Sequence, residues 1–163
     1  LLEVQNIENQ DIKYELRNLD GGILVQQENN DILTIDELKV VTNTKPTEDT
    51  IKSMLFGWQV LKHVKSNAII TVKDNTTVGI GAGQVSRIDA VDIAISKSKA
   101  AIKGSILCSD AFFPFRDSID KISQYNINGV IQPGGSIKDN EVIDACNEHN
   151  IPMVFTGRRC FKH

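Results

Sequence analysis

The sequence lacks long apolar runs and contains only three cysteines among its 163 residues. A membrane-spanning helix needs about 20 consecutive apolar residues, and a secretory signal needs an apolar stretch near the N-terminus. Because neither pattern occurs, we expect a cytoplasmic protein with no membrane partner. The cysteines are odd in number, far apart and without a C-x-x-C pair, so we expect Cys108, Cys146 and Cys160 to be buried thiols.

The sequence also has no excess of basic residues. The chain has 18 Lys and Arg residues against 21 Asp and Glu residues, which gives a net charge of -3. Nucleic acids and anionic membranes bind basic surfaces, so we expect neither as a partner. A small anion needs only a local cluster of cations, and the chain ends in one: Arg158, Arg159, Lys162 and His163. The first residue is Leu1 and not Met, which leads us to expect a segment of a longer polypeptide.

The metal-binding strings of zinc deaminases are absent as well. Those enzymes need H-x-E and P-C-x-x-C to hold the metal and to position the general acid, and neither string occurs here. We therefore expect no zinc. Lys62-His63 places a cation beside a titratable ring, but a lone His at a predicted helix end is more often a solvated cap than a base.

Strand and helix patterns alternate along the chain. Pro46-Thr47 followed by apolar residues at helical spacing (Ile51, Met54, Leu55, Trp58 and Leu61) predicts a helix with a buried stripe. Strands are predicted around residues 1–5, 12–19, 23–28, 68–73, 77–80, 105–108, 130–132 and 153–155, and further helices up to Ala100 and over 140–148. The opening segments predict an antiparallel region. The rest predicts an α/β layer structure whose sheet is at least partly parallel, and because no repeat or long linker occurs we expect the whole chain to form one folding unit.

Two glycine-rich segments follow predicted strands. The first, Gly79–Gln84, reads G-x-G-x-G-Q and lacks the third glycine of the dinucleotide fingerprint. It predicts either a phosphate cradle or a tight turn from strand to helix, and the hydroxyl of Ser86 beside the guanidinium of Arg87 favours ligand contact. The second, Gln132–Ile137, has N–H groups that either bind a carboxylate or carbonyl oxygen or simply form a turn.

An aromatic segment, Ser109–Asp117, comes directly after another predicted strand and contains three phenylalanines. Loops at the carboxyl ends of sheet strands are well placed to meet a ligand. Aromatic rings can face a flat heterocycle, and Asp117 can accept hydrogen bonds from its amino groups. The alternative is that the phenylalanines pack in the core.

Five strings taken together resemble one family: KHVKSNA, GIGAGQVSRID, SDAFFPFRD, QPGGSI and FTGRRCFKH. It is the family of bifunctional purine biosynthesis proteins, which join an AICAR transformylase to an IMP cyclohydrolase. The resemblance runs along essentially the whole chain. It implies that residues 1–163 form the second, C-terminal lobe of the transformylase domain, with the first lobe and the cyclohydrolase domain outside this chain. The implied fold is a cytidine-deaminase-like three-layer α/β lobe with a mixed sheet and no zinc site.

The resemblance also implies an activity. The family's transformylase carries the formyl group of its co-substrate, 10-formyltetrahydrofolate, to AICAR during IMP synthesis, and its members work as homodimers. Its catalytic lysine and histidine belong to a K-H-x-N-P-C-G-like motif of the first lobe. No such string occurs here, so we expect the isolated chain to be inactive. Some members hold a structural monovalent cation, which the resemblance places near Asp110 and the C-terminus.

The same resemblance implies two sets of contacts. The AICAR set is Asn67, Arg87 and Arg159, with Ser86 beside Arg87, and Asn67 would also help to orient the reacting groups. The folate set is Ile88, Phe112, Asp117, Ser136 and Ile137. Two functions of other classes stay open: a stand-alone AICAR- or folate-binding module, and a lobe that serves only dimerisation.

Overall fold

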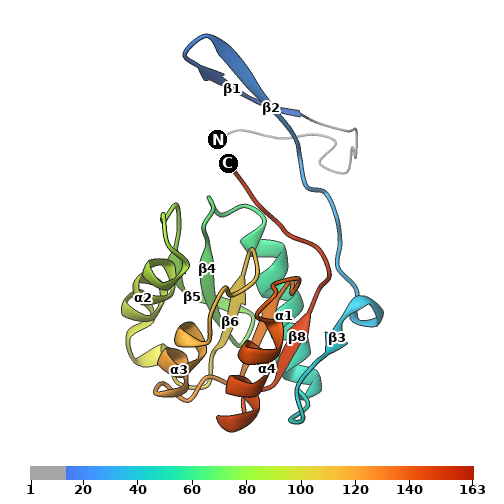
Figure 1. Cartoon of the computed structure of the whole chain (residues 1–163), viewed down its shortest axis with the longest axis vertical. Helices are drawn as coiled ribbons and strands as arrows, with labels where there is room; N and C mark the ends of the chain where they lie inside the picture. The colour runs from blue at the N-terminus through green and yellow to red at the C-terminus, as the bar shows by residue number, and fades with distance from the viewer. Residues whose placement is uncertain (1–13) are drawn as a thin grey trace, which may run out of the picture. The chain divides into compact units, whose positions relative to one another are not determined.

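A computed structural model describes residues 14–163, which fall into two compact units. The first unit ends at Ile32, and the second spans Leu33–His163. The prediction of a single folding unit is therefore wrong. In the first unit, β1 (Tyr14–Leu19) and β2 (Gly22–Gln27) form an antiparallel hairpin (Figure 1). This confirms the antiparallel opening, whereas the strand predicted at residues 1–5 lies outside the described residues.

The second unit is built on a six-stranded mixed sheet with the order β3-β8-β7-β6-β4-β5. Strands β6, β7 and β8 are parallel, whereas β3, β4 and β5 each pair antiparallel with their neighbours. The strands are β3 (Lys39–Val40), β4 (Ile69–Lys73), β5 (Thr76–Gly81), β6 (Ile106–Ser109), β7 (Gly129–Gln132) and β8 (Met153–Phe155). The helices are η1 (Ile35–Glu37), α1 (Glu48–Leu61), α2 (Arg87–Ser98), η2 (Lys99–Ile102), α3 (Asp117–Ser123) and α4 (Asp139–Glu148).

Helices cover both faces of this sheet and complete three layers. Successive strand residues point to opposite faces. Accordingly, Ile70 of β4 belongs to the core beneath α1, and its neighbour Ile69 belongs to the core beneath α2, α3 and α4. The α/β class, the mixed sheet and the three layers predicted above are confirmed.

The sequence signals around α1 act as predicted. Thr47 caps the helix, since its side chain accepts a hydrogen bond from the Thr50 N–H. Three stripe residues, Met54, Trp58 and Leu61, are buried. The helix ends at Leu61 with Lys62 as its C-cap, so His63 lies just beyond the helix and is exposed.

Three helical features differ from the prediction, and the first is η1, since no helix was predicted at Ile35–Glu37. Helix α2 ends at Ser98, and a short 3₁₀ helix follows it where the prediction continued to Ala100. Helix α3 was not predicted, because its seven residues are too few to show a helical period. No helix within the described residues is long and apolar enough to cross a membrane.

The cysteines are buried thiols, as predicted. Burial raises the pKa of Cys146 to about 12, which keeps the thiol protonated at neutral pH. Cys108 packs against α1 at Gly57. A Cβ atom on Gly57 would lie only 2.3 Å from the Sγ atom of Cys108. The glycine is therefore needed for the close approach of α1 to the sheet.

Candidate functional site

The residues assigned to ligands gather at one edge of the sheet, where the parallel strands end. The loop after β6 carries Phe112, the loop after β7 carries Ser136, and the segment after β8 carries Arg159. Asn67 comes shortly before β4, whose first residue pairs with the last residue of β6. The carboxyl edge of parallel strands is the usual ligand-binding edge of an α/β sheet.

A buried ion pair lies at the centre of this edge. Arg87 Nη1 donates to Asp110 Oδ1 at 2.7 Å and to Ser109 Oγ at 2.9 Å. Arg87 is 8% exposed and Asp110 is fully buried. The other carboxylate oxygen, Oδ2, accepts from the Ala68 N–H at 3.1 Å. The Arg87 guanidinium, which the resemblance assigned to AICAR, thus already binds groups of the protein itself.

Asn67 joins this pair to the loop before α2. Its Oδ1 accepts from Arg87 Nη2 at 2.8 Å, and its Nδ2 donates to the carbonyl oxygens of Gln84 and Val85 at 2.9 and 3.0 Å. The main chains of Asn67 and Gln84 also exchange hydrogen bonds of 3.2 and 3.3 Å. Asn67 therefore clamps this loop to the start of β4, and its role toward a substrate stays a prediction.

The C-terminal segment is fastened to the same edge. The Cys160 N–H donates to the main-chain oxygen of Asp110 at 3.1 Å. Ser66 and Lys162 are joined twice, by Ser66 N–H to Lys162 O at 2.9 Å and by Lys162 N–H to Ser66 Oγ at 3.0 Å. Burial raises the pKa of Cys160, and the nearby Asp110 carboxylate raises it further, so this thiol stays protonated. On the other side of Arg159, the Gly157 N–H donates to Pro133 O at 3.1 Å, so Arg159 projects from a segment that is held on both sides.

The three phenylalanines of the aromatic segment have different environments. Phe113 is fully buried, so the core alternative is correct for this ring. Phe115 is 55% exposed, and Phe112 is half-buried. The guanidinium carbon of Arg159 lies 4.9 Å from the centroid of the Phe112 ring. The structure therefore brings together one residue assigned to AICAR and one assigned to folate.

The glycines of the first segment serve packing. Gly79 and Gly81 belong to β5, so the loop predicted to begin at Gly79 is a strand as far as Gly81. A Cβ atom at Gly79 would lie 2.2 Å from the carbonyl oxygen of Ala94, and one at Gly81 would lie 2.0 Å from that of Ala90. Both missing side chains are needed for α2 to approach β5. The phosphate-cradle interpretation of these two glycines is wrong.

The turn that follows leads directly into α2. Gly83 has a φ of +67°, which a residue with a side chain rarely adopts. Ser86, assigned to the AICAR site, caps the helix, and its Oγ accepts from the Asp89 N–H at 3.2 Å. Ile88, assigned to folate, is half-buried in the first turn.

The second glycine loop holds a carboxylate of the chain itself. Asp139 accepts hydrogen bonds from the Gly135 N–H at 2.7 Å and from the Ser136 N–H at 3.1 Å. Carboxylate binding by these N–H groups matches one of the two predicted alternatives, but the bound group was not foreseen. The available signal was an acidic residue in the first turn of a predicted helix. Ile137, assigned to folate, is fully exposed beside this loop.

Asp117 stands at the start of α3 and is exposed, with Oδ1 accepting from the Ser118 N–H at 2.7 Å. The residue before it, Arg116, donates to Asp120 at 2.8 and 2.9 Å and to Glu148 at 2.6 Å. His149 Nε2 lies 2.9 Å from Asp120 Oδ1. This charged cluster connects the end of the aromatic segment to α4. Within residues 14–163, no group of three or more His, Cys, Asp or Glu side chains could hold a metal ion.

Asp120 predicts a specific dependence of stability on pH. Hydrogen bonds from Arg116, and then from His149, lower its pKa from 3.8 to about 2. Its contribution is therefore fully present above about pH 4 and is lost as the pH falls toward 2. We expect Asp120→Asn to lower the free energy of unfolding at pH 6 by about 1 kcal/mol or less, because the carboxylate is well exposed to solvent.

Urea denaturation of both proteins between pH 6 and pH 2 tests this expectation. The difference in free energy should shrink over the lower part of that range. Asp144→Asn, at an exposed α4 residue, is the control and should show no such convergence. A difference for Asp120→Asn that stays constant down to pH 2 would contradict the assignment.

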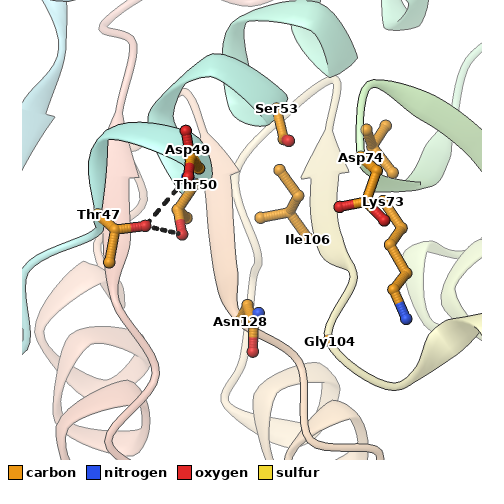
Figure 2. Close-up of a pocket in the computed structure, with 10 residues that line it drawn as sticks. Thr47, Asp49, Thr50, Ser53, Lys73, Asp74, Gly104, Ile106 and Asn128 are labelled. Atoms are coloured by element: carbon orange, nitrogen blue, oxygen red, sulfur yellow. Dashed lines mark hydrogen bonds between the residues drawn. The ribbon is translucent and has the colours of Figure 1, made fainter.

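A small pocket opens at the opposite edge of the sheet. It is lined by Thr47, Asp49, Thr50, Ser53, Val72, Lys73, Asp74, Gly104, Ile106 and Asn128. Figure 2 shows Thr47 and Thr50 hydrogen-bonded to each other at the start of α1. Lys73 Nζ donates to the carbonyl oxygen of Lys103 at 2.9 Å. This pocket includes none of the residues assigned to AICAR or folate.

The second unit is an α/β domain whose polar and aromatic side chains gather at the carboxyl edge of its parallel strands, the edge where α/β proteins usually bind ligands. The family model described as AICARFT/IMPCHase bienzyme matches residues 1–97. The chain belongs to this family.

Curated relatives with the name bifunctional purine biosynthesis protein PurH match the chain closely. The protein of Persephonella marina is 49% identical over 100% of this chain and 32% of its own length. That of Caldicellulosiruptor saccharolyticus is 47% identical over the same shares, and that of Aquifex aeolicus is 50% identical over 92% of this chain and 30% of its own length. The chain thus spans about a third of the length of these relatives.

Two solved structures of Acinetobacter baumannii RibD also align with this chain. Form 1 has a TM-score of 0.45 and 12% identity, covering 66% of this chain and 34% of RibD. Form 2 has a TM-score of 0.41 and 10% identity, covering 64% of this chain and 33% of RibD. Similarity at this level does not define a common fold.

Proposed function

We propose that this chain is the substrate-binding, C-terminal lobe of an AICAR transformylase in purine biosynthesis. In this proposal it binds AICAR and 10-formyltetrahydrofolate at the carboxyl edge of β6, β7 and β8. The observation that carries the proposal is the position of Arg159, an exposed cation beside the half-buried ring of Phe112. One ligand subsite there would be anionic and the other aromatic.

The charges of the arginines support the anionic subsite. Four described arginines pair with carboxylates: Arg17, Arg87, Arg116 and Arg158. Arg159 has no carboxylate partner among residues 14–163, and its guanidinium lies over the rings of Phe112 and Phe161. Because a guanidinium offers a planar set of donors that matches phosphate, Arg159 is the arginine best suited to bind the phosphate of AICAR.

The exposure of three side chains assigned to folate supports the folate subsite. Because the Phe112 ring is only half-buried, its exposed part can stack on a pteridine while the rest of the ring stays packed against the protein. Asp117 is an exposed carboxylate at the end of the same aromatic segment, and carboxylates accept hydrogen bonds from amino groups of a heterocycle. Ile137, fully exposed, supplies apolar surface that a ligand would cover.

The chemistry of formyl transfer needs more than this chain offers. The aromatic amine of AICAR is a poor nucleophile and needs a general base, and the formyl carbon needs a donor for its developing oxyanion. We assign both roles to the first lobe of the transformylase in a homodimer, with Asn67 as a positioning group. The chain alone would therefore bind substrates without turning them over.

Arg159→Ala is the decisive variant for the anionic subsite. In the protein that carries this chain, we expect it to weaken AICAR binding about ten- to hundredfold, because it removes a charge-assisted contact. Isothermal titration with AICAR and with its dephosphorylated nucleoside measures the effect. Arg158→Ala, which removes the neighbouring arginine paired with Glu37, is the matched control and should change AICAR affinity little.

The nucleoside separates the possible outcomes. If Arg159 binds the phosphate, Arg159→Ala leaves nucleoside affinity nearly unchanged. An equal loss of affinity for AICAR and for the nucleoside would show that Arg159 does not bind the phosphate. A wild-type protein that binds neither AICAR nor folate would overturn the proposed function as a whole.

A further inference from the structure

Phe161 is an aromatic residue that none of the assignments above includes. Its ring centroid lies 5.7 Å from the guanidinium carbon of Arg159, and the Phe112 centroid lies 4.9 Å from the same atom. Both distances are within the range of about 6 Å for cation–π contacts. Arg159 is thus contacted by two rings from separate parts of the chain, the loop after β6 and the C-terminal segment.

Hydrogen bonds of neighbouring residues hold the main chain that carries both rings. Next to Phe112, Phe113 is fully buried, and its N–H donates to Gln132 Oε1 at 3.0 Å. Phe161 lies between Cys160, whose N–H donates to Asp110 O, and Lys162, whose N–H donates to Ser66 Oγ. The main chain beside each ring is therefore hydrogen-bonded to the edge of the sheet, while Arg159 itself is exposed.

This arrangement solves a physical problem of the anionic subsite. An exposed arginine has many rotamers, and ordering it when a ligand binds costs conformational entropy. Rings that contact the guanidinium limit these rotamers before binding. Because cation–π contacts use the face of the guanidinium or its charge and not its N–H groups, the donors stay available to an anion.

We propose that Phe161 is a positioning residue that, together with Phe112, holds Arg159 ready for the phosphate of AICAR. The inference rests on the proposed function for its ligand, but not for its geometry. It assigns a role to the C-terminal segment beyond Arg159 itself. It also predicts that Phe161 affects AICAR and leaves folate binding unchanged, whereas Phe112 affects both.

The binding test uses Phe161→Leu in the protein that carries this chain. We expect AICAR to bind about two- to fivefold more weakly, as the loss of one exposed cation–π contact implies. Folate affinity measured without AICAR, and the melting temperature, should stay unchanged. Phe161→Tyr should restore AICAR affinity. On the Arg159→Ala background, Phe161→Leu should have no further effect, since the residue on which it acts is gone.

A matched control and a ligand-free measurement complete the test. Phe115→Leu removes an exposed ring of the same aromatic segment and should leave AICAR affinity unchanged. In NMR spectra without ligand, the side-chain Nε–H signal of Arg159 should carry a ring-current shift that decreases in Phe161→Leu and in Phe112→Leu. This readout does not depend on the identity of the ligand.

The outcomes distinguish the inference from the proposed function. An Arg159 signal that is the same in wild type and Phe161→Leu overturns the inference, whichever ligands bind. Wild-type binding of AICAR that Phe161→Leu leaves intact overturns it as well. A ring-current shift in a protein that does not bind AICAR refutes the proposed function and, with it, the assigned ligand, while the contact between Phe161 and Arg159 is supported.

Discussion

Replacing Arg87 with methionine is expected to lower the free energy of unfolding by about 3 to 5 kcal/mol, because it leaves the charge of Asp110 buried without its partner. Asp110 is fully buried, and its Oδ1 lies 2.7 Å from Arg87 Nη1. Methionine retains much of the apolar volume of arginine, so the loss reports mainly the unpaired carboxylate. The variant also removes the donor to Asn67 Oδ1, which loosens the loop before α2.

Urea denaturation at pH 7 measures this effect, and two further variants identify its cause. Arg158→Met breaks the partly exposed pair with Glu37 and should cost about 1 kcal/mol or less. Combining Arg87→Met with Asp110→Asn removes the buried charge, so the double variant should be less destabilised than the sum of the single ones. A loss below 1 kcal/mol for Arg87→Met alone would show that the pair is not buried in solution.

The elements that could be predicted are those whose signals lie close together in sequence. Helix α1 is an example, because its cap at Thr47 and its apolar stripe up to Leu61 fall within 15 residues of one another. Strands β4 and β5 are another example, because they were predicted at 68–73 and 77–80 and are joined by Asp74 and Asn75, whose φ values are 50° and 54°. Local patterns therefore gave most of the strands and helices of the second unit.

Contacts that depend on strand order could not be predicted. Arg87 and Asp110 are 23 residues apart and meet only because β6 lies beside β4, to which Asn67 and the loop before α2 are attached. From the sequence alone, Arg87 is assigned to a ligand, because an arginine at the start of a helix suits an external anion as well as it suits an internal carboxylate. Only the buried position of Asp110 distinguishes an internal partner from an external one.

The glycines show a different limit. A missing side chain allows either an anion or a packed helix to approach the backbone, so the pattern at Gly79 and Gly81 is the same in both cases. The structure decides for packing, because the carbonyl oxygens of α2 occupy the space that each Cβ would need. At Gly135 an anion and not a helix approaches the backbone, because the Gly135 N–H binds the carboxylate of Asp139.

Phe113 and Phe112 are adjacent in sequence, but truncating each to alanine should have very different results. Phe113 is fully buried in the core formed with α2, α3 and α4, and Phe113→Ala should lower the free energy of unfolding by about 3 to 5 kcal/mol. Phe112 is half-buried at the edge of the sheet. Phe112→Ala should cost much less stability, because the removed ring leaves a space that water can enter.

For folate binding we expect the reverse: the change at Phe112 should have the larger effect and the change at Phe113 the smaller one. This comparison tests the folate subsite. Phe112→Ala is expected to weaken folate binding by the larger factor and AICAR binding by the smaller one that follows from its contact with Arg159. Phe113→Leu, which keeps most of the buried volume and a folded core, is the matched control and should bind folate normally. Thermal denaturation and folate titration of the three proteins measure both quantities. If Phe112→Ala melts as far below wild type as Phe113→Ala, and its folded fraction binds folate normally, Phe112 is a core residue and the aromatic segment does not form the folate subsite.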